Sequence, residues 1–440
     1  MPRLGMAALA AILSGMAAGG WAQGEPADPS PPPGAAPPQV VVMSMNLYLG
    51  PLGVPTVLAV RSGCPGWINA QVTKTWQKIQ LTDFSQRADA IACQIVARRP
   101  DLIGLQEMML FRSGPPDGLE GNPTRAEQVE LDFLAILLEK LACRGLPYTP
   151  VAITEETDVE LPGCLSPAGT HGPAEPRDLR MTDRVGILVR TDLLASGVQL
   201  FNVQGARFDA HEDLKVGPGG YAVPICMGWN SVDVAWGERT FRFVNTVLEL
   251  NNLPRLQRVQ LQQTEELIRG PLSTNLPVIL VGDSNSPAQK ARAPAYEMLL
   301  GAGLHDAWLH THPGEPGYTW GNRPYLRNPI PMAYKQNRFD LILFRDRFQA
   351  VAMQRVGIDR SERTVTGMWP SDHAGVIATL RLDCLPADSS HGSVGRASRS
   401  GGGPAVAKLD SDSAGRVVSE RIGLRRPTNH LRDLVPPYDE

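Results

Sequence analysis

The residues of this sequence that can do chemistry are polar side chains at the ends of apolar runs. Asp283 and Asn285 follow "PVILVG", and Asp372 and His373 come just before "AGVIATLRL". Similar positions are held by Asn46, Glu107, Asn245 and Asp340. Taken singly, an Asp or Asn after a strand is more often a turn residue or a helix N-cap. An unpaired carboxylate such as Glu107 is costly at a core strand's end, and rigid sheets present functional groups there, so we predict one shared site.

Pooled, these groups form a set of carboxylates and amides with a single histidine. Oxygen ligands of this kind suit a hard divalent cation, Mg²⁺, Mn²⁺ or Ca²⁺. Such a cation neutralises the charge of a phosphate ester and positions it for attack by water. His373 is a natural base near neutral pH, and Asp340 bonded to its other ring nitrogen would fix its tautomer. The residue types therefore predict metal-assisted chemistry on a phosphate ester.

Strand-like apolar runs carry these polar residues. They are expected at Val40–Tyr48, Asp101–Glu107, Arg184–Arg190, Phe241–Leu250, Pro277–Asn285, Phe339–Phe344 and Gly375–Leu382. Apolar residues at spacings of three and four predict helices over Phe84–Arg99, Ala126–Cys143 and Arg255–Ile268, with Asp83 as an N-cap for the first. Loop-like insertions are expected near 112–124, 154–182 and 205–224. Strands that alternate with helices predict an α/β or α+β fold.

The two ends of the chain differ in composition from its middle. A basic start, an apolar stretch and small residues predict a signal peptide over residues 1–22, and hence a secreted or periplasmic protein. A Pro-rich linker is expected over 23–39 and a disordered tail over 385–440. One domain is then expected over residues 40–384, with no transmembrane segment, and we expect it to be a monomer.

Six cysteines remain after the predicted signal peptide. An even number in an exported chain permits three disulfides, although some can instead be buried free thiols. For Cys93, on the apolar side of a predicted helix, the two interpretations are equally open. Because the cysteines show no paired C-x-x-C spacing, the sequence does not predict a zinc site.

The polar motifs occur in the order that is typical of a known family. The sequence resembles the endonuclease/exonuclease/phosphatase superfamily, whose fold is that of deoxyribonuclease I, and in particular its secreted bacterial members. The matching motifs are "SMNLYLG", "PDLIGLQEM", "FRFVNTVLEL", "LPVILVGDSNS", "NRFDLILFR" and "WPSDHAGV". The resemblance implies a four-layer α/β/β/α sandwich, in which two mainly antiparallel sheets pack face to face. It also implies a metal-dependent phosphoric ester hydrolase of the nuclease or phosphodiesterase type.

The resemblance assigns roles to the polar residues. Glu107, helped by Asn46, would hold the metal, with Asp372 at or near it. Asp283 and Asn285 would orient the attacking water and the phosphate. His373, supported by Asp340, would act as a base or a phosphate contact, and Asn245 would contact the phosphate.

One position departs from the family pattern. The family typically reads NTHLE, with a histidine that assists the leaving group or binds phosphate, whereas this chain reads "NTVLE" with Val247. Loss of one acid–base group typically costs about 10²–10⁴-fold in rate. Tyr48, His305 and His310 are candidates to compensate, and the sequence does not choose among them.

Three functions are therefore open. The first is an exported phosphoesterase, most simply a phosphodiesterase. The second is a phosphoester- or metal-binding protein whose catalysis is weakened at Val247, and the third is an interaction module with structural calcium. The substrate is equally open among DNA, RNA, phospholipids and small phosphoesters, although a net charge of −3 tilts slightly away from long nucleic acid. Five tryptophans could line a groove or belong to the core: Trp67, Trp76, Trp229, Trp236 and Trp320.

Overall fold

The computed structural model describes residues 39–382 apart from 51–53, 117–125, 166–174, 216–219, 221 and 333–335. The predicted signal peptide and C-terminal tail lie outside the described residues, as does the linker up to residue 38. Those domain boundaries therefore stay predictions.

The larger sheet, sheet A, has the strand order β15-β16-β1-β2-β6-β3-β4, and β5 also pairs with β6. Its strands β1 and β2 run parallel, and its other pairs run antiparallel. The bounds are β1 Gln39–Asn46, β2 Leu102–Gln106, β3 Leu110–Gly114, β4 Gln128–Asp132, β5 Tyr148–Leu165, β6 Glu175–Arg190, β15 Phe348–Val356 and β16 Gly375–Leu382.

The smaller sheet, sheet B, has the order β13-β14-β12-β11-β10-β7, with β11 and β12 parallel and the other pairs antiparallel. Its bounds are β7 Gln199–Arg207, β10 Gly228–Trp236, β11 Arg239–Val247, β12 Val278–Asp283, β13 His305–Asp306 and β14 Asp340–Arg345. A separate hairpin joins β8 (Glu212–Lys215) to β9 (Ala222–Ile225).

Successive residues of a strand point to opposite faces of its sheet. In the core strands both sets are apolar, so one face packs on the other sheet and the opposite face packs on helices. In β1, Val40 and Val42 enter the core between the sheets, whereas Met43 and Met45 face the helices. The helices are α1 Val54–Ser62, α2 Pro65–Leu81, α3 Phe84–Arg98, α4 Phe133–Cys143, α5 Thr191–Ala195, α6 Pro254–Arg269, α7 Pro294–Gly301 and α8 Ala307–Thr311, with a short 3₁₀ helix at Arg360–Glu362.

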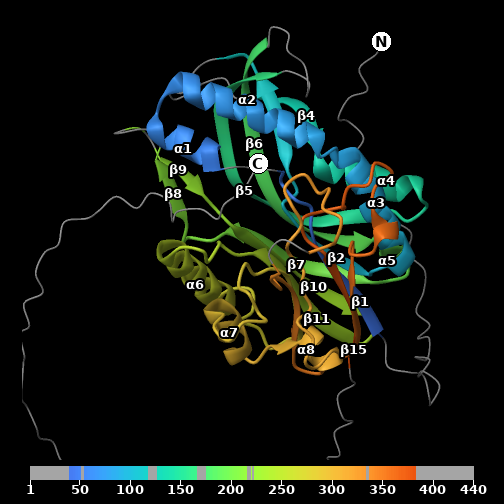
Figure 1. Cartoon of the computed structure of the whole chain (residues 1–440). Helices are drawn as coiled ribbons and strands as arrows, with labels where there is room; N and C mark the ends of the chain where they lie inside the picture. The colour runs from blue at the N-terminus through green and yellow to red at the C-terminus, as the bar shows by residue number, and fades with distance from the viewer. Residues whose placement is uncertain are drawn as a thin grey trace, which may run out of the picture. The chain divides into compact units, whose positions relative to one another are not determined.

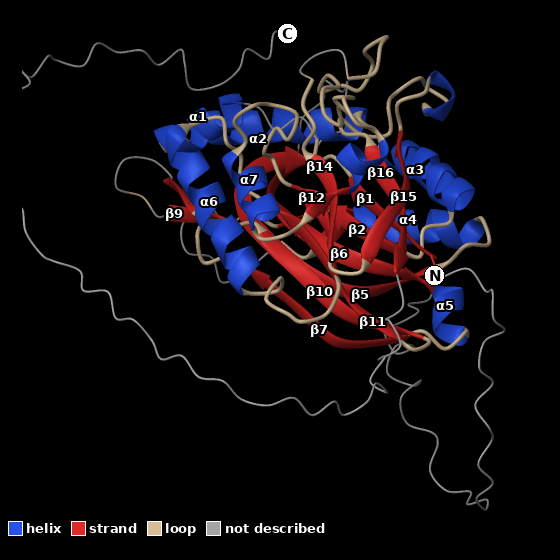
Figure 2. Ribbon diagram, turned by 90° about the horizontal axis from the view of Figure 1, so that it is seen from below, coloured by secondary structure: helices blue, strands red, loops and turns tan. Residues whose placement is uncertain are grey.

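The helices complete four layers. Figure 1 shows α2, α3 and α4 on one side of the sheets, and α6 and α7 on the other side. Apolar side chains of α2, α3 and α4 pack on sheet A, and those of α6 and α7 pack on sheet B. Figure 2 shows the strands stacked between these helical layers. The predicted four-layer sandwich of two mainly antiparallel sheets is confirmed.

Individual elements depart from the predictions where neighbouring strands decide the conformation. The helix expected over Ala126–Cys143 starts only at Phe133, because the residues before it form β4 and Asp132 caps the helix by accepting from Leu134 and Ala135 N–H groups. The insertion expected as a loop over 154–182 is instead most of the long β5–β6 hairpin. Helices α1 and α2 were not predicted, whereas Asp83 caps α3 as expected, by accepting the Gln86 N–H.

The disulfides that the cysteine count permits are not found in the described part of the chain. Five of the six cysteines lie in the described residues, and all five are free: Cys64, Cys93, Cys143, Cys164 and Cys226. Cys384 lies outside the described residues. Cys93 is exposed on α3 and does not belong to the core. In the described ranges, no helix combines the length and apolar character needed to cross a bilayer.

Candidate functional site

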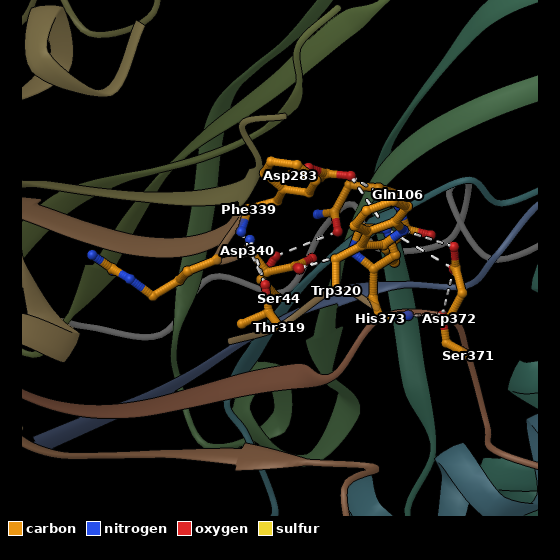
Figure 3. Close-up of polar contacts among 12 residues, drawn as sticks. Ser44, Gln106, Asp283, Thr319, Trp320, Phe339, Asp340, Ser371, Asp372 and His373 are labelled. Atoms are coloured by element: carbon orange, nitrogen blue, oxygen red, sulfur yellow. Dashed lines mark hydrogen bonds and ion pairs between the residues drawn. The ribbon is translucent and has the colours of Figure 1, made fainter. Parts of the chain in front are cut away.

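The site forms where strand ends from both sheets meet. Because β1 and β2 run parallel in register, Asn46 pairs with Gln106 and lies beside the following Glu107. In sheet B, Asp283 at the end of β12 pairs with Asp340 at the start of β14. Face-to-face packing of the sheets joins the two groups. Figure 3 shows Asp283 and Asp340 of sheet B close to Asp372 and His373, which lie just before β16.

Asn46 connects the two sheets at this point. Its amide Nδ2 donates to Glu107 Oε1 (2.9 Å) and to Asp283 Oδ2 (3.1 Å). Its Oδ1 accepts the Tyr48 N–H at 2.8 Å, and Glu107 Oε2 accepts the Leu49 N–H at 2.5 Å. Asn46 therefore holds the two carboxylates in place, while its own amide oxygen is already engaged.

His373 lies just before β16 and is held by a carboxylate. Its Nδ1 is 2.8 Å from Asp340 Oδ2, so the other ring nitrogen, Nε2, faces the site. This Nε2 lies 3.8 Å from Asp283 Oδ2 and 3.9 Å from Asp372 Oδ1. Asp372 is oriented by the Trp320 indole N–H, which donates to its Oδ2 at 3.0 Å. The predicted pair of Asp340 and His373 is thus formed in the structure.

The donor set fits a divalent cation. Glu107, Asp283 and His373 each offer one atom, and these atoms lie within 4.8 Å of one another. Carboxylate oxygens are the ligands that Mg²⁺ or Mn²⁺ prefers, so Glu107 would hold the ion, with Asp283 and the imidazole of His373 beside it. Asp372, predicted as a ligand, faces the same histidine nitrogen from the opposite side of the cluster.

Burial disfavours the charged form of the carboxylates at the site. It raises the pKa of Asp283 and of Asp372 to about 6 each, and it raises the pKa of Glu107 above its usual value. Burial alone would lower the pKa of His373, but the carboxylates of Asp340, Asp372 and Asp283 hold it well above its usual value. A bound cation would relieve the repulsion among these carboxylates.

Asn285 lies at the site, and Asn245 does not. The Asn285 N–H donates to Asp283 Oδ1 at 2.9 Å, and its Nδ2 donates to the Leu248 carbonyl at 2.8 Å. Asn245 is fully buried between the sheets, where its Nδ2 donates to the carbonyls of Leu105 and Gly186. The structure therefore places Asn245 as a bridge between the sheets, out of reach of a phosphate.

Val247 is buried at the end of β11, paired with Asp283. Neither His305 nor His310 can compensate for it. His305 pairs with Phe344, four residues or ~13 Å along β14 from Asp340, and the His310 ring lies near the same Phe344. Tyr48 lies near the site, but its hydroxyl donates to the Pro324 carbonyl at 2.8 Å.

Two further residues support the site: Arg87, which was not predicted, and Trp320, whose role the sequence left open. Arg87 of α3 is fully buried and donates to carbonyls of the loops that carry Tyr48 and Asp372. The sequence could have indicated its burial, because Arg87 interrupts the apolar stripe of a predicted helix. Of the five tryptophans, Trp320 is the one whose side chain forms a hydrogen bond with a site residue. Trp76 of α2 belongs instead to the core between the helices and sheet A.

The four-layer sandwich thus carries carboxylates and a carboxylate-bound histidine at its strand ends. A model described as the Endonuclease/Exonuclease/phosphatase family matches residues 64–373. The chain belongs to this family.

Similar proteins were found among curated sequences and solved structures. Tyrosyl-DNA phosphodiesterase 2 of Mus musculus is 30% identical over 158 residues, which are 34% of this chain and 40% of that protein. The same protein of Rattus norvegicus is 29% identical over 156 residues, with the same shares. The chain thus matches about 40% of the length of these relatives. An endonuclease/exonuclease/phosphatase family protein from Leptotrichia buccalis C-1013-b is similar at 13% identity and a TM-score of 0.46, over 78% of this chain and 99% of that chain.

Proposed function

We propose that this protein is an exported phosphodiesterase that depends on a divalent cation, Mg²⁺ or Mn²⁺ in preference to Ca²⁺. The observation that carries the proposal is the Asp340–His373 pair, whose free nitrogen faces the Glu107 and Asp283 carboxylates. Hydrolysis of a diester is favoured by the relatives, whose names describe a phosphodiesterase. Export is favoured by the composition of the first 22 residues.

Each residue of the site has a chemical task in this proposal. The cation, when bound, neutralises charge on the phosphate and lowers the cost of the transition state. Glu107 and Asn46 hold the cation site together, and Asp283 accepts a proton from the attacking water. His373, protonated because the carboxylates raise its pKa, donates from Nε2 to a phosphate oxygen while Asp340 keeps the ring oriented.

Removal of the metal or of its carboxylate tests this function. We expect hydrolysis of bis-p-nitrophenyl phosphate with Mg²⁺ or Mn²⁺, and loss of that activity with EDTA or in Glu107→Ala. Glu127→Ala, which removes an exposed carboxylate from the sheet A side, is the matched control. Activity that survives both EDTA and Glu107→Ala would contradict the proposal. Rates compared on DNA, RNA, sphingomyelin and phosphomonoesters identify the substrate class.

The second candidate function, a binding protein with weakened catalysis, is favoured by the buried Val247. Val247→His distinguishes it from the enzyme. Because the rest of the site is assembled, we expect the natural protein to turn over and the variant to change kcat by less than about tenfold. A rise of several hundredfold in kcat would instead show that the natural chain is the weakened binding protein.

A further inference from the structure

Two carboxylic side chains outside the site described above lie at an irregularity in the β5–β6 ladder. Glu155 pairs with Arg184 and Asp158 pairs with Thr182, so Glu156 and Thr157 together oppose Asp183. Such a bulge re-aims the side chains of the bulged strand. The segment between β9 and β10 holds it in place, because the Thr157 hydroxyl donates to the Cys226 carbonyl and accepts the Cys226 N–H.

The bulge turns Glu156 into the space between the sheets. Glu156 is completely buried, and its Oε1 lies so close to β10 that a Cβ on Gly228 would be 3.3 Å from it. Among the described residues, neither oxygen of Glu156 has a hydrogen-bond partner. The backbone N–H of Gly228 lies close enough to lower the pKa of Glu156, although it does not complete a hydrogen bond to either oxygen. A buried carboxylate without partners is costly, so its place in a folded protein calls for a ligand.

A cation is the ligand that suits two carboxyl groups facing each other across a strand pair. Burial and the neighbouring Asp183 raise the pKa of Glu156 well above its usual value, and burial followed by Glu107 raises that of Asp183 to about 8. Glu156 and Asp183 therefore repel each other, and Glu107 adds to this repulsion.

The nearby arginines are engaged elsewhere. The Arg184 guanidinium donates to the Met108 carbonyl at 2.7 Å and pairs with Asp132 at 2.5 Å. The Nε of Arg207 donates to the Glu155 carbonyl at 2.7 Å. Neither forms an ion pair with Glu156 or Asp183 within the described residues.

We propose that Glu156 and Asp183 hold a second divalent cation, beside the one at Glu107. Asp183 is half-buried and provides the route of entry, and Glu156 closes the inner side. Two carboxylates completed by water are a usual protein contribution to a Mg²⁺ or Mn²⁺ site. A proton alone would satisfy neither oxygen of Glu156, because a neutral acid still lacks a hydrogen-bond partner there.

Binding of Mn²⁺ to the full chain, measured by equilibrium dialysis, tests this site. We expect two ions per wild-type chain and one ion in Glu156→Gln and in Asp183→Asn. The matched control is Glu155→Gln, an exposed carboxylate on the same strand, which should retain both ions. A single ion on the wild-type chain, or two ions on Glu156→Gln, would overturn the site.

Thermal unfolding separates loss of the ion from loss of the fold. In EDTA, Glu156→Gln should melt at or above the wild-type temperature, because the repulsion between Glu156 and Asp183 has been removed. The rise in melting temperature on adding Mn²⁺ should be smaller in the variant than in wild type, and an equal rise would count against the site. Two bound ions on a chain without hydrolase activity would support this site and overturn the proposed function.

Discussion

His373→Ala is expected to lower kcat by about 10²–10⁴-fold, the range typical for loss of one acid–base group. The side chain is almost completely buried, its Nδ1 is committed to Asp340, and its Nε2 faces both Asp283 and Asp372. Its removal takes away the donor to phosphate and leaves three carboxylates without their positive partner. Steady-state rates on a phosphodiester with saturating Mg²⁺ measure the effect.

Asp340→Asn tests whether Asp340 acts by orienting the His373 ring, because the imidazole itself is retained. An amide at this position can donate to Nδ1 and so favours the wrong tautomer, for which we expect a fall in kcat of at least about 10²-fold. His211→Ala provides a histidine control, because His211 is exposed and contacts its own loop. If His373→Ala kept more than a tenth of the wild-type rate while His211→Ala was unchanged, the assigned role of His373 would be wrong.

Arg87→Met is expected to lower the free energy of unfolding by about 3–5 kcal/mol. Arg87 is fully buried and donates to the carbonyls of Thr82, Leu47, Tyr48 and Pro370. Its guanidinium also lies 4.8 Å from the centre of the Phe84 ring. Methionine fills much of the volume but leaves these buried acceptors without a donor. Urea unfolding at neutral pH measures the loss.

The same substitution should also impair the site. Arg87 joins the loop after β1 to the loop before β16, and these loops carry Tyr48 on one side and Asp372 with His373 on the other. Arg98→Met is the control on the same helix, since Arg98 is exposed and should change stability by no more than about 0.5 kcal/mol. A loss below about 1 kcal/mol in Arg87→Met would show that the loops are held by other contacts.

Much of the fold was predictable because the core strands are short apolar runs with polar ends. The strands that carry Asn46, Glu107, Asp283 and Asp340 were expected within a few residues of their observed bounds. Helix α3 was expected with its Asp83 cap. Elements that depend on partners were not predictable: β4 has no strand-like pattern of its own and forms because β3 pairs with it. The β5–β6 hairpin looked like a loop because its polar residues point to neighbours that only folding supplies.

The site residues also fall into those that the sequence could predict and those that only the structure identifies. The residue types of Glu107, Asp283 and His373, and their order along the chain, were enough to predict a phosphoesterase site. The distinction between Asn245 and Asn285 was not visible, because both follow or interrupt an apolar run with the same local pattern.

By itself, the sequence determined the class of fold, the family and the chemical character of the site, because these depend on local patterns and on residue identity. Only the tertiary structure decided that Asn46 bridges to Asp283, 237 residues away, that Asn245 is a structural bridge, and that Glu156 is buried without a partner. The physical reason is that these properties depend on strand register and sheet packing. A one-residue change of register turns every side chain of a strand to its opposite face.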